Sequence, residues 1–315
     1  MSKIYDIVII GGGPAGLTAA LYACRARMKT LLIEKMLPGG QVLIADTIEN
    51  YPGFPEGIKG PDLAEWMFKQ ASHFGLELKT SEAVKVDKKT DEAGAFKVHL
   101  QDGEPLEARS LIIATGASWN TLNVPGEKKL TGRGVSYCAT CDGPLFKNRE
   151  VVVIGGGDTA LGDAIFLTKF ARKVTIIHRR NKLRATKILQ ERALANKQIE
   201  FRLNSVATEI KGTDRVESVE IKDVETGGIS SVKADAAFVL VGMTPNTDVV
   251  KSSIKLDDKG YVLTDDDMKT SASGIFACGD VRKKLLRQVI TATGDGATAA
   301  FNAEHYVEGL KPGGK

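Results

Sequence analysis

The chain has 315 residues, enough for two domains of ordinary size, and its 43% hydrophobic and 26% charged residues are typical of a soluble globular protein. Its formal net charge of only +4, without a basic stripe interleaved with aromatic residues, argues against nucleic-acid binding. No apolar run approaches the length that spans a bilayer, which argues against a membrane protein.

The first predicted element is an aliphatic strand from Ile4 to Ile10 that runs directly into a glycine turn. A secretory signal needs a basic start, an apolar stretch and a small-residue cleavage site, and Met1-Ser2-Lys3 followed by this strand does not fit that pattern. We therefore expect a cytoplasmic location. Four cysteines in such a chain are too few for a disulfide framework, so a pair of them indicates redox or metal chemistry.

This strand begins a pattern that the chain contains twice. Ile7–Gly16 and Val151–Ala160 each place four aliphatic residues before G-x-G-x-x-G/A, and a helical stretch and a second aliphatic strand follow each copy. The glycines of such turns allow the backbone to approach a pyrophosphate, which the first N–H groups of the helix then bind. Two copies in this context favour two Rossmann-like dinucleotide-binding domains over two glycine-rich turns without a ligand. The candidate ligand-binding residues are Gly11, Gly13, Pro14, Ala15 and Gly16 in the first copy and Gly155, Gly157, Asp158 and Thr159 in the second.

The two copies differ at the end of their second strand, where such domains distinguish between dinucleotides. The first copy has Glu34 there, followed by Lys35, and a carboxylate at this place accepts hydrogen bonds from a ribose diol. The second copy has a histidine and an arginine cluster, which suits a 2′-phosphate because guanidinium groups bind phosphate oxygens in pairs. We therefore expect NADP(H) at the second copy, with a solvated basic surface as the alternative reading of the arginines. The residues concerned are His178, Arg179, Arg180 and Arg184.

Two glycine-containing crossings, Ala114–Ala117 and Gly242–Pro245, flank the second copy. They predict an α/β protein in which the second nucleotide-binding domain is inserted into the first. We expect residues 1–116 and 245–315 to form the first domain and residues 117–244 the second. Within the second domain the helix after the glycine turn contains Gly162, which should weaken it by roughly 1 kcal/mol relative to alanine.

The tetrapeptide Cys138-Ala139-Thr140-Cys141 lies ahead of the second copy. A structural zinc site would need a second cysteine pair or histidines at ligand spacing, whereas Cys24 and Cys278 are single and distant, so a redox dithiol is favoured over a metal site. A nicotinamide gives up a hydride while a disulfide is opened by nucleophilic attack, and a flavin mediates between the two. The first copy is then the natural FAD site. Asp142, directly after the dithiol, either acts as its general acid/base or caps the turn before Gly143-Pro144.

With these residues assembled, the chain closely resembles the low-molecular-weight (bacterial and archaeal type) thioredoxin reductases over nearly its whole length. This family has the pyridine nucleotide-disulfide oxidoreductase architecture, an FAD domain with an inserted NAD(P)H domain. The matching motifs include the two glycine turns, the dithiol with Asp142, and the arginine cluster. The others are Pro38-Gly39-Gly40-Gln41, Ile48-Glu49-Asn50-Tyr51-Pro52-Gly53, Ala114-Thr115-Gly116-Ala117, Val241-Gly242 with Pro245-Asn246-Thr247, and Gly279-Asp280 with Arg287-Gln288.

The resemblance implies NADPH-dependent reduction of thioredoxin through FAD and the Cys138–Cys141 pair, with Cys141 facing the flavin, Cys138 attacking thioredoxin and Asp142 as their acid/base partner. It also implies a homodimer formed mainly by the FAD domain and a rotation of the two domains between half-reactions, for which the two crossings could serve as hinges. The residues it implies for FAD, besides the first glycine turn and Glu34, are Gly40, Gln41, Asn50, Thr115, Gly116, Gly279, Asp280, Arg287, Gln288 and Val289.

Three alternatives remain open at this point. The flavoprotein subunit of alkyl hydroperoxide reductase has an additional N-terminal dithiol domain, which this sequence lacks. A ferredoxin- or flavodoxin-type NADP reductase would not need Cys138 and Cys141. A non-enzymatic zinc or nucleotide sensor would not carry a flavin.

Overall fold

The computed structural model describes residues 4–45, 47–88 and 95–310. Met1, Ser2 and Lys3, on which part of the expectation about location rests, lie outside the described residues. The chain folds into two compact units, the first comprising residues 1–118 and 244–315 and the second residues 119–243. The sequence predicts boundaries at residues 116 and 244, and the units divide at residues 118 and 243.

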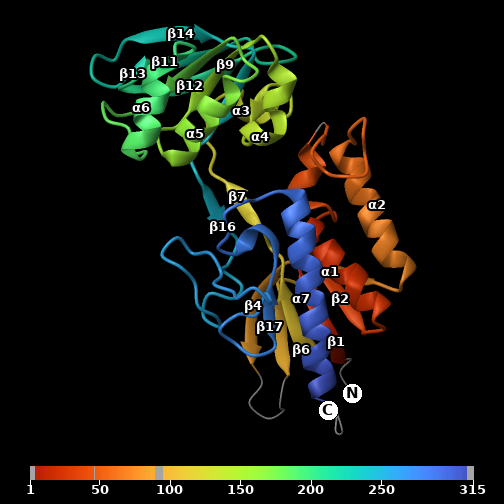
Figure 1. Cartoon of the computed structure of the whole chain (residues 1–315). Coiled ribbons are helices and arrows are strands. Elements are labelled where there is room, and N and C mark those ends of the chain that lie inside the picture. Colours follow the sequence, from red (N-terminus) through yellow and green to blue (C-terminus); the bar gives the residue numbers. More distant parts are fainter. Residues whose placement is uncertain (1–3, 46, 89–94, 311–315) are drawn as a thin grey trace. The chain divides into compact units, whose positions relative to one another are not determined.

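The first unit is built on a mixed seven-stranded sheet (Figure 1). Its order is β3-β2-β1-β6-β5-β4, and the second half of β6 pairs with β17. Strands β1, β2, β3, β6 and β17 are parallel, whereas β5 at one edge pairs antiparallel with both β6 and β4. The strands are β1 Ile4–Ile10, β2 Thr30–Glu34, β3 Glu77–Thr80, β4 Ala83–Lys88, β5 Phe96–Leu100, β6 Leu106–Ile113 and β17 Ile275–Ala277.

Helices α1 (Pro14–Arg25) and α7 (Val289–Gly309) lie side by side against this sheet, and α2 (Gly60–His73) packs on α1 (Figure 1). Alternate residues of β1 enter different cores: Ile7 and Ile9 pack with the α1 and α7 side chains, and Val8 and Ile10 pack on the opposite face. Burial on both faces explains why this strand is a continuous aliphatic run. Two short 3-10 helices, η1 (Gly40–Ile44) and η3 (Gly279–Val281), complete the unit.

The second unit has a five-stranded parallel sheet of order β11-β10-β9-β15-β8 and a separate antiparallel sheet, β12-β13-β14. The predicted α/β fold class, with two units that each have their own parallel-strand core, is thereby confirmed. The strands are β8 Val135–Ser136, β9 Glu150–Ile154, β10 Lys173–Ile177, β11 Ile199–Arg202, β12 Ser205–Lys211, β13 Ser218–Asp223, β14 Ile229–Lys233 and β15 Ala236–Val239. The helices are α3 Glu127–Leu130, α4 Ala139–Asp142, η2 Gly143–Phe146, α5 Asp158–Leu167 and α6 Lys187–Ala195.

The two crossings between the units contain short strands, β7 (Ala117–Trp119) and β16 (Met243–Pro245), which pair with each other. Asn246 fixes one end of this ribbon: its N–H donates to Gly116 O (3.0 Å), and its carbonyl accepts from Thr115 Oγ1 (2.6 Å). The two strands overlap the predicted crossings at Ala117 and at Met243–Pro245.

The fingerprint helices begin at Pro14 and Asp158, inside the glycine motifs, whereas the sequence predicts helices that follow the motifs. Each helix starts directly after the second glycine of its motif, because Gly13 and Gly157 are extended and serve as the N-cap residues. Among the residues that the structure describes, no helix is both long and apolar enough to cross a bilayer.

Candidate active site

The first glycine turn joins β1 to α1 and is shaped by close backbone packing. Gly11 has φ +106°, and a side chain there would collide with the backbone of Ala114. Gly16 lies so close to the Gly11 carbonyl that a methyl group would overlap it. Gly13 differs, because a methyl group added to it would meet no atom within 4 Å. The chain thus needs Gly11 and Gly16 for its own packing, whereas Gly13 faces open space at the N-terminus of α1.

The carboxylate of Glu34 is held beside this turn. Gly12 N donates to Glu34 Oε2 at 2.7 Å, and Met36 N donates to Oε1 at 3.1 Å. The backbone therefore fixes the side chain at the end of β2, where a ribose diol would be bound. Lys35, the next residue, is exposed.

The other residues predicted for the first dinucleotide come from distant segments but border the same turn. A methyl group on Gly40 would lie 3.1 Å from Gly13 Cα, and one on Gly279 would lie 2.8 Å from the Ala15 side chain. Gln41 donates its amide N–H to Ala117 O. Asn50 donates to Gln288 Oε1 (3.0 Å), which links the segment before α2 to the start of α7.

The carboxyl group of Asp280 indicates whether the residues around the first glycine turn fit a ligand. Its Oδ1 atom is buried and has no hydrogen-bond partner among the described residues. Burial raises the pKa of this carboxyl, while the positive charges of Lys284 and Arg287 oppose the rise. A buried acceptor without a donor is costly, and a donor group of a bound ligand would remove that cost. The observed residues therefore fit FAD, which offers such hydroxyl groups.

The loop after Asp280 leads to three further predicted residues. The Arg287 guanidinium lies over the Tyr261 ring, 4.2 Å from its centroid, and Arg287 Nε donates to Asp280 O at 3.5 Å. Gln288 caps α7 through a reciprocal capping box with Thr291. Val289, the first residue of the helix, is partly buried against the small apolar cluster around Val42.

A mostly buried charge cluster under this loop was not predicted from the sequence. Asp295 in α7 accepts from Arg282 (2.9 Å) and Lys284 (2.7 Å), and the three side chains are only 10–12% exposed. It also accepts from Gly279 N at 3.0 Å. The one signal in the sequence was an acidic residue between two glycines, Gly294 and Gly296, inside a helix.

The second glycine turn joins β9 to α5 and also has an open position. A methyl group on Gly157 would meet no atom within 4 Å, whereas one on Gly156 would overlap the His178 ring. The carbonyl of Gly156 accepts from Arg184 N (2.7 Å) and Ala185 N (3.1 Å). The backbone thus ties the arginine-bearing loop to the glycine turn. Asp158 accepts from Thr186 N (2.7 Å), and Thr159 is exposed.

The cluster of basic residues separates into one buried histidine and three exposed arginines. His178 is 5% exposed and its Nε2 lies 3.2 Å from Lys182 O. Burial lowers the pKa of His178, and the neighbouring arginines lower it further, so the ring is neutral at pH 7. Arg179, Arg180 and Arg184 are exposed, and within the described parts of the chain no carboxylate forms an ion pair with them. Their charges are therefore available to an anion.

The sulfur atoms of Cys138 and Cys141 form a disulfide in the second unit. Cys138 is the N-cap of α4, and its Sγ accepts from Cys141 N at 3.2 Å and lies 3.3 Å from Thr140 Oγ1. Both cysteines are partly exposed, while Ala139 between them is fully buried in the core beneath α5. This anchor places the disulfide on the same packed unit as the second glycine turn.

Asp142 ends α4, is partly exposed, and donates its N–H to Cys138 O at 3.1 Å. The remaining cysteines, Cys24 and Cys278, are buried and unpaired. Burial raises the pKa of both thiols, which makes them poor nucleophiles.

Comparison with known proteins gives consistent results. The profile of the pyridine nucleotide-disulphide oxidoreductase family matches residues 5–296. A thioredoxin reductase of Peptoclostridium litorale is 51% identical over 98% of this chain and 99% of its own length. The crystal structure of a Streptococcus pyogenes thioredoxin reductase is 46% identical with a TM-score of 0.93, over 98% of this chain and 100% of that one. A Lactococcus lactis thioredoxin reductase, described as the FR conformation, is 45% identical over 96% and 99% of the two chains, with a TM-score of 0.65.

Proposed function

Because the chain belongs to the pyridine nucleotide-disulphide oxidoreductase family, and within it to the thioredoxin reductases, we propose that it transfers electrons from NADPH, through FAD and the Cys138–Cys141 disulfide, to oxidised thioredoxin. Members of this family are flavoprotein oxidoreductases that use FAD and NADPH. The observation that carries the proposal is the partly exposed disulfide, which packs on the unit that contains the second glycine turn.

We assign FAD to the first unit. Gly13 and the N-terminus of α1 would face its pyrophosphate, Glu34 its ribose, and Asp280 a further donor group. When bound, FAD accepts a hydride from NADPH and supplies two electrons to a disulfide. The protein contributes the backbone turn, in which Gly11 and Gly16 pack against other parts of the backbone.

We assign NADPH to the second unit. Gly157 leaves open space at the N-terminus of α5, and the arginine-bearing loop is tied to that turn through Gly156 O. Arg179, Arg180 and Arg184 would bind the 2′-phosphate, which NADH lacks. Neutral His178 contributes by filling the space beneath Gly156 rather than by its charge.

The surroundings of Cys138 support the role that we assign to it. Cys138 Sγ already accepts an N–H and lies beside the Thr140 hydroxyl, and donors of this kind stabilise a thiolate. After reduction, the Cys138 thiolate attacks a sulfur of the thioredoxin disulfide, breaks that bond and forms a mixed disulfide. Cys141, the sulfur that we assign to the flavin, then attacks Cys138, which releases dithiol thioredoxin and re-forms the Cys138–Cys141 bond. Asp142 is placed to exchange protons with these sulfurs.

A rotation of the two units accompanies this cycle in our proposal. The disulfide must meet the flavin in one half-reaction and a protein substrate in the other. Two solved relatives with nearly equal identity and coverage give TM-scores of 0.93 and 0.65 against this chain, which supports a family in which intact units adopt different arrangements. The paired strands β7 and β16 are the segments about which this chain would rotate.

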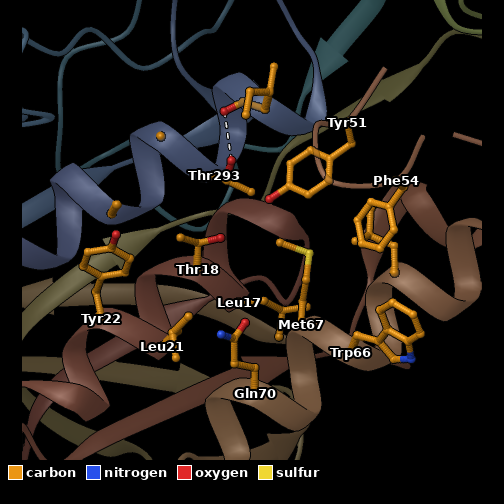
Figure 2. A pocket seen from close by; sticks show the side chains of 14 residues that line it. Leu17, Thr18, Leu21, Tyr22, Tyr51, Phe54, Trp66, Met67, Gln70 and Thr293 are labelled. Carbon is orange, nitrogen blue, oxygen red and sulfur yellow. Dashed lines mark hydrogen bonds between the residues drawn. The ribbon is translucent and has the colours of Figure 1, made fainter. Parts of the chain in front are cut away.

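A homodimer, formed by the first unit, is part of the proposal. Helices α1, α2 and α7 surround an apolar pocket of about 470 Å³, in which Tyr51, Phe54 and Trp66 gather at one end (Figure 2). Trp66 is 54% exposed although it belongs to this aromatic group. An apolar hollow with exposed aromatic side chains is suited to an identical surface of a second copy. Trp66→Glu should yield monomers in sedimentation velocity, whereas Ile188→Glu, at an equally exposed residue of the second unit, should not.

A coupled assay tests the function, with thioredoxin-dependent NADPH oxidation as the readout and a cytoplasmic thioredoxin as the proposed physiological substrate. Cys138→Ser should abolish thioredoxin reduction and still permit NADPH to bleach the flavin, because that cysteine acts only after the flavin. Cys24→Ser, at a buried cysteine outside the dithiol, is the matched control and should retain activity. Normal turnover of the Cys138 variant would contradict the proposal.

A further inference from the structure

The carboxylate of Asp295, which is mostly buried, accepts hydrogen bonds from three donors of the loop that contains Asp280. Its Oδ1 accepts from Arg282 at 2.9 Å, and its Oδ2 accepts from Lys284 at 2.7 Å and from Gly279 N at 3.0 Å. Asp295 and Lys284 are 12% and 10% exposed. A mostly buried carboxylate that is held by three donors has one well-defined position.

The packing of α7 explains why this carboxylate lies there. A side chain at Gly296 would overlap the carbonyl of Ala15, so glycine allows α7 to approach the start of α1 closely. Gly279 also abuts Ala15, at 2.8 Å for an added methyl group. Asp295 therefore holds the Gly279–Asp280 loop against the same helix start that forms the first glycine turn.

The neighbouring carboxylate, Asp280, has the opposite environment. Its Oδ1 is buried without a partner, although the charge of Lys284 is close enough to affect its pKa. An ion pair between Lys284 and Asp280 would satisfy that oxygen within the protein. Lys284 instead binds Asp295. Asp295 thus accepts from three donors, whereas Asp280 Oδ1 accepts from none of the described residues.

We propose that Asp295 is a positioning residue for the cofactor: by pairing with Lys284, it keeps this cation from Asp280, whose acceptor is thereby reserved for a donor group of FAD. The inference rests on the assignment of FAD to the first unit. Asp295 itself does not touch the cofactor in this account. The preference for FAD binding arises because a competing internal ion pair is prevented.

The test measures the affinity of apoprotein for FAD by quenching of flavin fluorescence, with no turnover required. Asp295→Asn should weaken FAD binding about 10- to 100-fold, because it frees Lys284 to pair with Asp280. Lys284→Met alone should stay within about threefold of wild type, since Asp295 still binds Arg282 and Gly279 N. The double variant Asp295→Asn/Lys284→Met should recover at least half of the lost affinity on a logarithmic scale, because the competing cation is gone.

The double variant decides between positioning and general support of the fold. If Asp295 only stabilised the structure, removing Lys284 as well would not restore FAD binding, and that result would overturn the inference. Unchanged affinity in Asp295→Asn would overturn it too. Should Asp295→Asn not fold, Asp295→Glu, which displaces the carboxylate by one methylene, is compared with and without Lys284→Met in the same way. Failure of the wild-type apoprotein to bind FAD would instead refute the proposed function and the inference together.

Discussion

The substitution Gly157→Ala tests whether the second glycine turn binds a cofactor or has only a structural role. Gly157 is the N-cap of α5, with φ −97° and ψ −177°, which alanine adopts without strain. A methyl group there meets no protein atom within 4 Å. The substitution therefore places a methyl group only in the space that we assign to the NADPH pyrophosphate.

The effects on stability and on binding can be worked out separately. Alanine reduces the entropy of the unfolded chain, which stabilises by about 0.4–1 kcal/mol, but it is a poorer N-cap than glycine by a similar amount. The free energy of unfolding should therefore change by less than about 0.5 kcal/mol. A methyl group that overlaps a bound ligand costs about 1–3 kcal/mol by analogy with overpacking, which raises the Kd for NADPH about 5- to 150-fold.

The assay is an anaerobic titration of the flavin with NADPH, together with thermal unfolding of the same preparation. Gly162→Ala is the matched control, since it is the same substitution on the same helix and also meets no atom within 4 Å. It should raise the free energy of unfolding by about 1 kcal/mol and leave NADPH binding unchanged. Wild-type NADPH affinity in Gly157→Ala would refute the assignment of this turn to the cofactor.

Three further predictions concern thiols, charge and specificity. In reduced native protein, iodoacetamide should label the two dithiol cysteines but not Cys24 or Cys278, because burial raises the pKa of the Cys24 and Cys278 thiols. Labelling of Cys24 or Cys278, detected by peptide mass spectrometry, would contradict this. Burial raises the pKa of Asp163 to about 6 from its usual 3.8, so the ionised side chain lowers stability above pH 6 and the effect fades as the pH falls toward 4. Asp163→Asn should therefore increase the free energy of unfolding by about 1–3 kcal/mol at pH 8 and by only about a third as much at pH 4.5, and equal effects at both would show the reasoning to be wrong. Replacing Arg179 and Arg180 by alanine should raise the KM for NADPH about tenfold or more without changing that for NADH, as measured by steady-state kinetics.

The parts of the site that could be predicted are those in which the decisive contacts lie within one short segment of the chain. Gly16 packs against the Gly11 carbonyl within one turn, so the spacing of the two glycines alone predicted the strand, the turn and the helix. The disulfide between Cys138 and Cys141 is similarly local, because one turn of helix brings the two sulfurs together.

The parts that could not be predicted depend on contacts between distant segments. Asp295 lies 15 residues beyond Asp280, and its role follows only when α7 packs against α1 and brings three donors to one carboxylate. His178 was predicted to belong to a cationic cluster, whereas its ring is buried beneath Gly156 and neutral. Sequence position alone does not reveal which residue of a basic run faces the core.

The most direct test of the proposed electron path is an anaerobic titration that counts the NADPH needed for full reduction. A flavin and a disulfide that exchange electrons each take up two, so wild-type protein should consume about two equivalents of NADPH per chain and return them on addition of oxidised thioredoxin. Cys138→Ser, which lacks the disulfide, should consume about one equivalent and return none to thioredoxin. Uptake of a single equivalent by the wild type would mean that the Cys138–Cys141 pair does not receive electrons from the flavin, and would contradict the account.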